Sequence, residues 1–186
     1  TTCSIKDESL YCWGNNSSGQ IGDGEEYVRY IQEHPGEIDT LAREIPSGPN
    51  WFFQDPGVWK LLREKLLPGL IRAKPDDSTI RAWVSGCATG EQTYSMAITL
   101  EEVLRASGSD IPYQIFATDI GRERILEARE GMYIANIEAD VSPERLDCFF
   151  VKKDNTYQIR YDIREKIVFA QHNILNHPPF IHLDIL

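Results

Sequence analysis

Two consecutive strand–turn–helix units constrain the fold of this chain more than any other feature. Residues 80–84 (IRAWV) are typical of a buried strand, and the loop 85–91 (SGCATGE), with its two glycines, leads into a helical pattern. A second unit follows, with a strand predicted over 113–118, a turn at 119–121 and a helix over 122–130. Strands that alternate with helices favour a parallel sheet with right-handed crossovers. We therefore predict an α/β protein with a doubly wound, Rossmann-like sheet.

Two further strands and an insertion are expected after these units. Residues 167–170 resume the strand pattern, and the chain ends on residues 180–186, which we also predict as a strand. In between, the pair 142–143 (SP) predicts a helix start, because serine caps a helix and proline suits its first position. Residues 153–155 (KDN) lie between two short apolar runs, as in a β-hairpin. We expect a small β-hairpin insertion at about 140–164.

A charged, helix-forming lead-in, residues 25–73, precedes the sheet domain at 74–186. It predicts one helix before the break at 34–36 (HPG) and a second over 37–44. A third is predicted from Pro56, because apolar residues recur there at intervals of three and four.

The first 24 residues differ in texture from the rest, being rich in Gly, Ser and Asn around a short strand signal at 9–13. The stretch 10–24 (LYCWGNNSSGQIGDG) resembles one repeat of the regulator-of-chromosome-condensation propeller family. A single repeat cannot bury its own face without neighbours. We therefore interpret this segment as a strand of foreign origin, and the chain as a chimera of two unrelated pieces.

The cysteines point to two different compartments. Cys3 and Cys12 are spaced to pair across a hairpin, as in a secreted protein, whereas Cys87 and Cys148 lie in contexts typical of a reduced, cytoplasmic protein. None of the four has the close spacing with histidine that marks a metal site. We expect a cytoplasmic location and no bound metal.

The composition excludes several classes of partner. With 19 basic and 29 acidic residues and a net charge of −10, the chain lacks the excess of Lys and Arg that phosphate binding needs. No stretch approaches the roughly 20 apolar residues that span a membrane, and no targeting leader opens the chain. We expect a small molecule or a protein as partner, no nucleic acid and no membrane insertion.

The glycine loop and the end of the second strand form the candidate site. In a doubly wound sheet a ligand lies beyond the carboxyl ends of the strands, where Gly86 and Gly90 let the backbone approach it. Asp119 closes the second strand and is placed to accept hydrogen bonds from a ribose diol. Two plainer interpretations stay open: the glycines form a simple tight turn, and Asp119 caps the following helix.

A series of motifs along the chain adds a family resemblance. The motifs, in order, are 51–56 (WFFQDP), 84–95 (VSGCATGEQTYS), 116–120 (FATDI), 172–175 (HNIL) and 178–180 (PPF). Together they resemble the chemotaxis-receptor glutamate methyltransferase (CheR) family over residues 25–186.

The resemblance implies a cofactor, a partner and a set of contacts. The cofactor is S-adenosylmethionine, or S-adenosylhomocysteine as product, and the partner is a chemoreceptor whose C-terminal peptide some members grip with a β-subdomain like the hairpin insertion. Glu91 would contact the cofactor, Asp119 its ribose, and Asn173 with Ile174 its adenine; Glu91 as a charge at a helix N-terminus and Asn173 as a turn residue are the alternatives. The implied cofactor-binding set is Asn50, Gln54, Gly86, Cys87, Ala88, Gly90, Glu91, Asp119, Asn173 and Ile174.

The methyltransferase sheet also implies a strand order. Four parallel strands are expected in the order 3-2-1-4, numbered along the chain. The last strand then forms an exposed apolar edge, which favours pairing with another chain. Two ways of covering this edge are open: the N-terminal strand at 10–13 pairs with it within the chain, or it helps a second copy cover the edge in a homodimer.

Two departures from the family pattern bear on activity. Gln54 stands where the family usually has an arginine thought to orient methyl donor and acceptor, and a neutral amide supplies no charged fork. Asn50 replaces a threonine and keeps its hydrogen-bonding capacity, while Phe52 and Phe53 are expected to lie in the core. Family members also continue beyond residue 186 with segments that close the donor pocket, so the sheet domain is interpreted as truncated.

Methyl transfer to an ionised carboxylate depends chiefly on alignment of donor and acceptor. We therefore expect weak cofactor binding and little or no transfer, which makes a binding-only module the leading interpretation. An active protein-glutamate O-methyltransferase is the alternative. No residue is assigned a catalytic role.

Overall fold

The computed structural model describes residues 2–6, 9–13, 25–34, 36, 50–75 and 77–186. The chain divides into two compact units, residues 1–48 and 49–186. The unit boundary therefore places the helix that begins at Glu25 in the first unit, whereas the sequence analysis grouped it with the lead-in.

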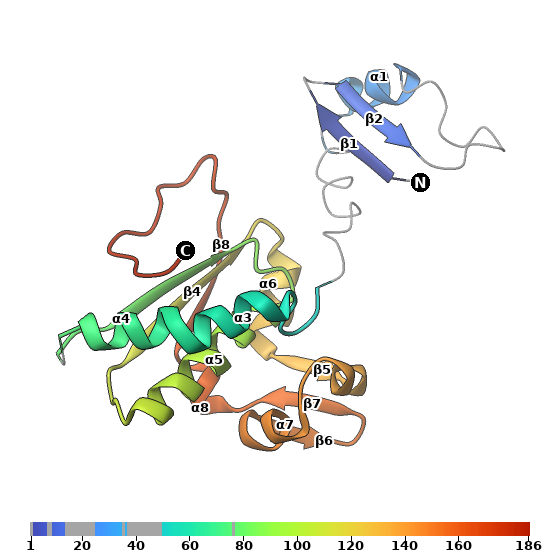
Figure 1. The fold of residues 1–186 in the computed structure, drawn as a ribbon. Helices are drawn as coiled ribbons and strands as arrows, with labels where there is room; N and C mark the ends of the chain where they lie inside the picture. Colours follow the sequence, from blue (N-terminus) through green and yellow to red (C-terminus); the bar gives the residue numbers. More distant parts are fainter. Residues whose placement is uncertain (1, 7–8, 14–24, 35, 37–49, 76) are drawn as a thin grey trace. The chain divides into compact units, whose positions relative to one another are not determined.

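The first unit contains an antiparallel hairpin and a helix. Strand β1 (Thr2–Lys6) pairs with β2 (Ser9–Trp13) in a register that sets Cys3 opposite Cys12, and helix α1 spans Glu25–Glu33 (Figure 1). The strand predicted near residues 9–13 is confirmed, while pairing of the two cysteines stays a prediction. The helix predicted over 37–44 and most of the propeller-like stretch lie outside the described residues.

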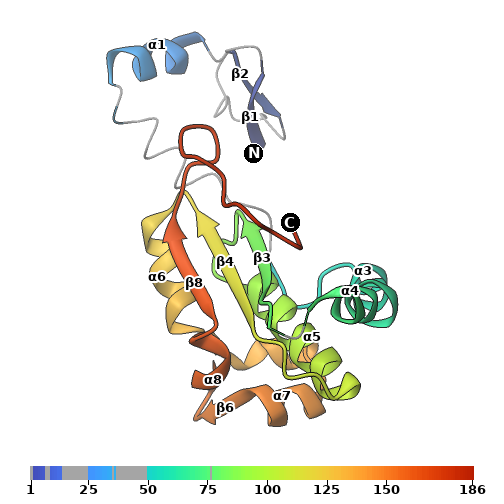
Figure 2. The same ribbon diagram turned by 90° about the vertical axis from the view of Figure 1, so that its left-hand side faces the viewer.

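A parallel sheet forms the centre of the second unit. Strands β3 (Ile80–Ser85), β4 (Tyr113–Asp119) and β8 (Ile167–Gln171) lie side by side in the order β3-β4-β8, all pointing the same way (Figure 2). Ile80 and Ile115 are fully buried, as expected for strands whose apolar side chains face the core. The α/β class and the parallel sheet are confirmed.

Two helices make the crossovers between these strands. Helix α5 (Glu91–Ser107) connects β3 to β4, and α6 (Arg122–Glu130) leads from β4 toward the insertion. Both helices end at a glycine in the left-handed conformation, Gly108 (φ 61°) and Gly131 (φ 60°), which is the usual C-terminal stop. Both helices lie where the sequence predicts them.

The strand predicted over 180–186 is wrong as a continuous strand. After β8 the chain turns at the carboxyl ends of the strands and returns beside β3, where Ile185 forms an isolated parallel bridge with Ala82 (Figure 2). His182 has a φ of 56°, which interrupts the extended backbone that a ladder requires. Asp184 still anchors the segment, because its Oδ2 accepts a hydrogen bond from Arg81 N at 2.9 Å.

The predicted amphipathic helix of the lead-in is confirmed, with a local change of winding. It runs through α3 (Pro56–Leu61), a π-helical turn (Leu62–Leu66) and α4 (Leu67–Ala73). Pro68 lies two residues after this turn and has no N–H to donate to an ordinary helical bond. Leu67 and Ile71 are buried against the core that α5 shares.

The insertion forms a β-subdomain, defined here as residues 132–164. Its three-stranded antiparallel sheet has the order β5-β7-β6, so the predicted hairpin is confirmed as β6–β7 and extended by a strand that the sequence analysis missed. Ser142 caps α7, as predicted, by accepting a hydrogen bond from Arg145 N. The elements are β5 (Met132–Ile134), a 3₁₀ turn (Ala135–Ala139), α7 (Pro143–Phe149), β6 (Phe150–Lys153), β7 (Thr156–Ile159) and α8 (Tyr161–Arg164).

Within the described residues, no helix is both long and apolar enough to cross a membrane.

Candidate cofactor site

The glycine loop between β3 and α5 is held in a tight, left-handed path. Gly86 (φ 68°), Ala88 (φ 44°) and Gly90 (φ 96°) all have positive φ, a region that glycine enters without strain. The loop closes on itself and on β4, because Gly90 N donates to Cys87 O at 2.8 Å and Cys87 N donates to Thr118 O at 2.9 Å. The tight-turn interpretation therefore describes the loop correctly, and the turn leaves Gly86 exposed at the end of the strand.

Asp119 ties this loop to the end of β4. Its side chain is 6% exposed; Oδ2 accepts a hydrogen bond from Ala88 N at 2.9 Å, and Oδ1 accepts one from Gly121 N at 2.8 Å. The alternative in which Asp119 caps α6 is wrong, because Gly121 occupies the cap position without a side-chain cap. A carboxylate oxygen can accept a second hydrogen bond, so contact with a ribose stays a prediction.

Asn173 and Ile174 follow the neighbouring strand β8. The residue before them, His172, is hydrogen-bonded to the backbone of Asp119. His172 N donates to Asp119 O at 2.9 Å, which brings the two strand ends together. Asn173 Oδ1 accepts from Leu175 N at 2.9 Å, so its side chain does form the turn that the alternative interpretation proposed. Ile174 is 60% exposed at this end of the sheet, and its contact with an adenine stays a prediction.

Glu91 is the first residue of α5 and is half-buried beside the loop. Thr89 Oγ1 lies within hydrogen-bonding distance of both its carboxylate oxygens, at 2.8 and 2.7 Å. Burial raises the pKa of Glu91 above its ordinary value, and the hydrogen bond from Thr89 opposes that rise. A cationic ligand nearby would favour the ionised carboxylate, as would the N-terminus of the helix.

Asn50 and Gln54 belong to the segment that enters the lead-in helix. Asn50 and Glu91 line the same cavity of about 350 Å³. Gln92 Nε2 donates to Trp51 O at 2.8 Å and lies 3.4 Å from Gln54 Oε1, so the segment is attached to the start of α5. The side-chain amide of Gln54 therefore lies beside α5, the helix that follows the glycine loop, and it is uncharged.

Phe52 and Phe53 are core residues, as predicted, with 1% and 7% of their surfaces exposed. The residues that pack against their rings, Tyr133 and Arg145, were not predicted from the sequence. Phe52 contacts Tyr133 of β5 edge to face, with ring centroids 4.9 Å apart, and Tyr133 Oη donates to Thr89 O at 2.8 Å. Arg145 of α7 lies over the ring of Phe53 at 3.9 Å. No spacing rule signals such contacts, because they join residues more than 40 positions apart.

Cys87 provides a direct test of the loop's packing. Burial, aided by the negative charge of Asp119, raises the pKa of the Cys87 thiol from 9.0 to about 12. The thiolate fraction then falls roughly a thousandfold, and the thiolate is the reactive form. We expect iodoacetamide at pH 8 to alkylate the exposed Cys148 and leave Cys87 unlabelled, as read by peptide mass spectrometry. Equal labelling of both in urea is the control; rapid labelling of Cys87 in the folded protein would contradict this packing.

The site as a whole lies at the carboxyl ends of three adjacent parallel strands. A positive-φ glycine loop follows one strand, a buried aspartate the next and an asparagine the third, at the edge where doubly wound sheets bind nucleoside-containing cofactors. Among the described residues, no cluster of His, Cys, Asp and Glu could hold a metal ion.

Comparison with known proteins identifies the domain. Residues 50–186 match the CheR methyltransferase, SAM binding domain, and the chain belongs to this family. It is 35% identical over 167 residues to an uncharacterized 104.1 kDa protein of Rhodobacter capsulatus, which covers 90% of this chain and 18% of that protein. It is 27% identical to a chemotaxis protein methyltransferase of Borreliella burgdorferi and 24% identical to that of Escherichia coli, covering 81% and 77% of this chain. The chain spans about half the length of these two methyltransferases.

The family makes S-adenosylmethionine the cofactor of this domain. The residues present fit it, because the loop backbone is open to approach at Gly86, where an added Cβ would meet nothing within 4 Å. Half-buried Glu91 offers a carboxylate for its positive charge.

Proposed function

We propose that this chain binds S-adenosylmethionine and S-adenosylhomocysteine as the cofactor-binding part of a methyltransferase related to the protein-glutamate O-methyltransferases of chemotaxis, and that it transfers methyl groups poorly. One observation carries the proposal: the glycine loop, Asp119 and the turn at Asn173 meet through two hydrogen bonds, Ala88 N to Asp119 Oδ2 and His172 N to Asp119 O. Three separate segments that the family uses for the cofactor are thereby adjacent.

Each segment has a distinct task in this proposal. The loop 85–90 approaches the methionyl part, Asp119 accepts from the ribose, and Asn173 with Ile174 borders the adenine. Glu91 balances positive charge on the ligand. The cofactor supplies a methyl group activated by its own positive sulfur, so the protein's contribution to transfer is alignment of donor and acceptor.

Gln54 is the reason for expecting poor transfer. An arginine at this position would present a planar, charged fork to an acceptor carboxylate, whereas the amide of Gln54 is neutral and lies beside Gln92. Orientation of the acceptor depends more strongly on that guanidinium than binding of the cofactor does.

An active protein-glutamate O-methyltransferase that acts on chemoreceptors is the second candidate. The β-subdomain favours it, because a three-stranded sheet with exposed side chains on its edge strand β5, Met132 (46%) and Ile134 (61%), offers an edge to an extended peptide. Transfer of a labelled methyl group to receptor protein separates this candidate from a binding-only module.

The finer arrangement of the sheet belongs to the same proposal. The bridge of Ile185 to Ala82 lies on the side of β3 away from β4, which supports the order 3-2-1-4 with the last position held by one residue pair. An edge so sparsely paired is where a second copy would add, and sedimentation across a range of concentrations measures that homodimer.

The test is calorimetric titration of S-adenosylhomocysteine into the wild type and Asp119→Ala. The variant leaves two backbone N–H groups without their acceptor, so we expect at least a tenfold loss of affinity, about 1.4 kcal/mol. Asp162→Ala, at an exposed surface ion pair, is the matched control and should bind as the wild type does.

Asp119→Asn separates loss of the site from loss of the fold, because it keeps one acceptor oxygen and nearly the same volume. Circular dichroism confirms that each variant is folded before titration. No heat with the folded wild type would sink the proposal, and unchanged affinity in folded Asp119→Ala would remove Asp119 from the site.

A further inference from the structure

We infer that Arg145 of the β-subdomain is a positioning residue for the cofactor site, and that Tyr133 supplies a second link, so that the β-subdomain and cofactor binding are energetically coupled. The inference rests on the proposed function, because it concerns the same site. It assigns to the β-subdomain a role inside the chain, in addition to any surface that it offers to a partner.

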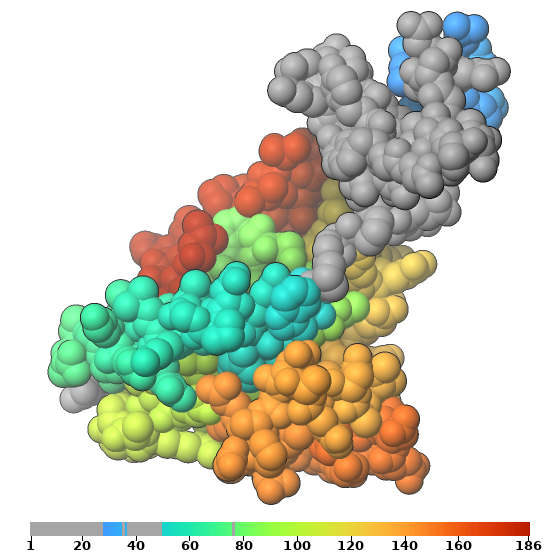
Figure 3. Space-filling model, turned by 45° about the vertical axis from the view of Figure 1, so that its right-hand side comes forward, coloured from blue at the N-terminus to red at the C-terminus, as the bar shows by residue number. Residues whose placement is uncertain are grey.

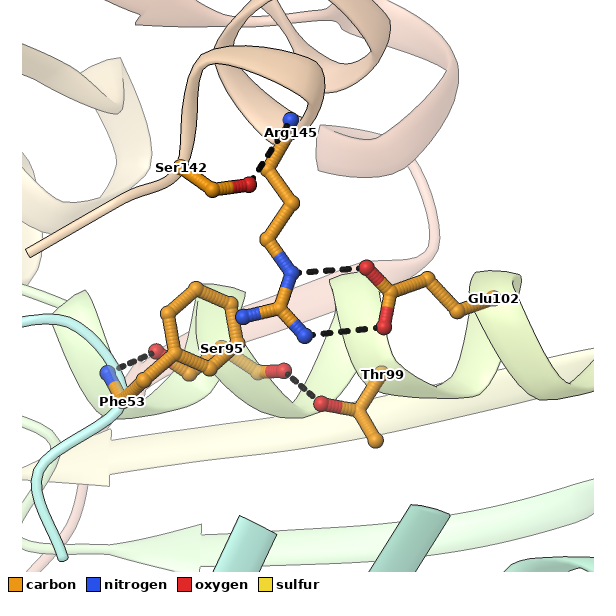
Figure 4. Close-up of polar contacts among 6 residues, drawn as sticks. All are labelled: Phe53, Ser95, Thr99, Glu102, Ser142 and Arg145. Atoms are coloured by element: carbon orange, nitrogen blue, oxygen red, sulfur yellow. Dashed lines mark hydrogen bonds and ion pairs between the residues drawn. The ribbon is translucent and has the colours of Figure 1, made fainter. Parts of the chain in front are cut away.

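Arg145 joins three parts of the second unit (Figure 4). Its Nε and Nη2 donate to the two carboxylate oxygens of Glu102 on α5 at 2.7 and 2.9 Å, a bidentate pair of which both side chains are at most one quarter exposed. The same guanidinium lies 3.9 Å from the centroid of the Phe53 ring. Only a planar, forked cation satisfies the carboxylate and the ring together.

Phe53 needs such support because its backbone is strained. Its φ is 52°, a value that a bulky residue rarely adopts, and Asp55 two residues later has a φ of 57°. Phe53 N donates to Ser95 Oγ at 2.9 Å (Figure 4). Ser95 Oγ donates in turn to Glu91 O, so the strained turn is bonded to the first turn of α5. The guanidinium of Arg145 lies over the ring of the same residue.

The strained turn at Phe53 is close to residues that are predicted to bind the cofactor. Asn50 precedes the strained turn, Gln54 lies within it between Phe53 and Asp55, and Glu91 provides the carbonyl that accepts from Ser95. A turn that relaxed toward ordinary φ values would move Asn50 and Gln54 away from α5. Arg145 therefore acts on the cofactor through Phe53 and touches none of the cofactor's expected contacts itself.

Tyr133 forms the second link, to the glycine loop. Its Oη donates to Thr89 O at 2.8 Å, and its ring packs edge to face on Phe52 with centroids 4.9 Å apart. The β-subdomain thus contacts both cofactor-binding segments, the loop through Tyr133 and the lead-in turn through Arg145. Figure 3 shows the part of the lead-in that belongs to the second unit (cyan, from residue 50) and the β-subdomain (orange) side by side on one face.

The first experiment compares Arg145→Lys with Arg160→Lys in the full chain. Lysine keeps the charge of Arg145 but loses the fork and the planar contact, whereas Arg160 belongs to an exposed pair with Asp162. We expect Arg145→Lys to weaken binding of S-adenosylhomocysteine about fivefold or more, within the range of ordinary coupling between sites, and Arg160→Lys to leave it unchanged. Unchanged affinity in folded Arg145→Lys would overturn the inference.

A double-mutant cycle with Phe53→Leu distinguishes positioning from general loss of stability. If Arg145 acts through the Phe53 ring, Arg145→Lys should add little to the affinity loss of Phe53→Leu. Full additivity of the two losses would show that Arg145 acts otherwise and would refute the assigned route.

Hydrogen exchange supplies a readout that a purely structural role would leave unchanged. Coupling is reciprocal, so S-adenosylhomocysteine should slow exchange at residues 132–134 and 143–150 in the wild type, and do so less in Arg145→Lys. Tyr133→Phe should weaken binding as well, while Tyr161→Phe, at a side chain that is 70% exposed, should not. Absence of binding by the wild type would count against the proposed function, whereas normal binding without a subdomain response would count against the coupling alone.

Discussion

Gly90→Ala is expected to lower the free energy of unfolding of the second unit by about 2–5 kcal/mol. Two costs combine in this value. An alanine at a φ of 96° carries a conformational penalty of about 1–2 kcal/mol, because its Cβ crowds the adjacent carbonyl. Overpacking in a closed site adds about 1–3 kcal/mol.

The side chains around Gly90 cannot move apart to admit a methyl group without breaking hydrogen bonds. The added Cβ would lie 3.1 Å from both Ala128 Cβ and Tyr133 Oη, and 3.3 Å from Tyr94 Cε2. Tyr133 is held by its bond to Thr89 O, and Tyr94 Oη donates to Ala128 O at 2.6 Å. Relief of the contact therefore disturbs the link between the glycine loop and the β-subdomain.

Gly86→Ala is the matched control for this prediction. Gly86 lies in the same loop with a φ of 68°, but an added Cβ there would meet no atom within 4 Å. It should show the conformational penalty alone, about 1–2 kcal/mol. Urea unfolding followed by circular dichroism measures both variants. Equal losses in the two would show that the space around Gly90 is not restrictive.

The parts of the fold that the sequence predicted are those that depend on local pattern. The strand of residues 80–84, the glycine loop and the helix over 122–130 follow from periodicity and from residues with special φ preferences, and all lie where expected. The segment 180–186 has an apolar pattern too, but a ladder also requires a suitable partner and an extended backbone at every residue. His182 breaks that condition, and no local rule predicts a positive φ at a histidine in this context.

The site shows the same division between local and distant information. Position at a strand end selected Asp119, motif resemblance selected Asn173, and the structure brings their strand ends together. The resemblance could not show that both oxygens of Asp119 accept backbone bonds, or that Asn173 stabilises its own turn. Those bonds make the residues part of the scaffold as well as candidates for the ligand.

The contacts of the β-subdomain with the glycine loop and the lead-in could not be predicted from the sequence, because they join residues that are far apart along the chain. Strand β5 has only three residues, and its burial alternates from exposed to half-buried and back, which resembles a loop. The middle residue of that strand is Tyr133, whose contacts lie 44 positions away at Thr89 and still further at Phe52. Only the folded chain brings them together.

Phe52→Ala is expected to cost about 3–5 kcal/mol, the range for removal of a fully buried aromatic side chain. Phe52 is 1% exposed and contacts Tyr133 at 4.9 Å and Phe150 at 5.7 Å between ring centroids, both edge to face. The cavity left behind lies between the lead-in and the β-subdomain, where strands β5 and β6 each contribute one wall. Both strands are paired with β7, which limits how far either can move to fill the cavity.

Trp51→Ala is the control, since Trp51 is larger, adjacent in sequence and 38% exposed, and its hydrogen bond from Gln92 Nε2 is accepted by the backbone carbonyl, which alanine keeps. It should cost distinctly less than Phe52→Ala in the same urea titration. Hydrogen exchange locates the damage: protection should fall first at residues 132–134 and 150–159, and persist in β4, whose Ile115 is fully buried. Uniform loss of protection would mean that the β-subdomain and the parallel sheet unfold as one cooperative unit. In that case the coupling assigned to Arg145 would operate through global stability. Arg145→Lys and the wild type should then bind the cofactor equally well under conditions where both are fully folded.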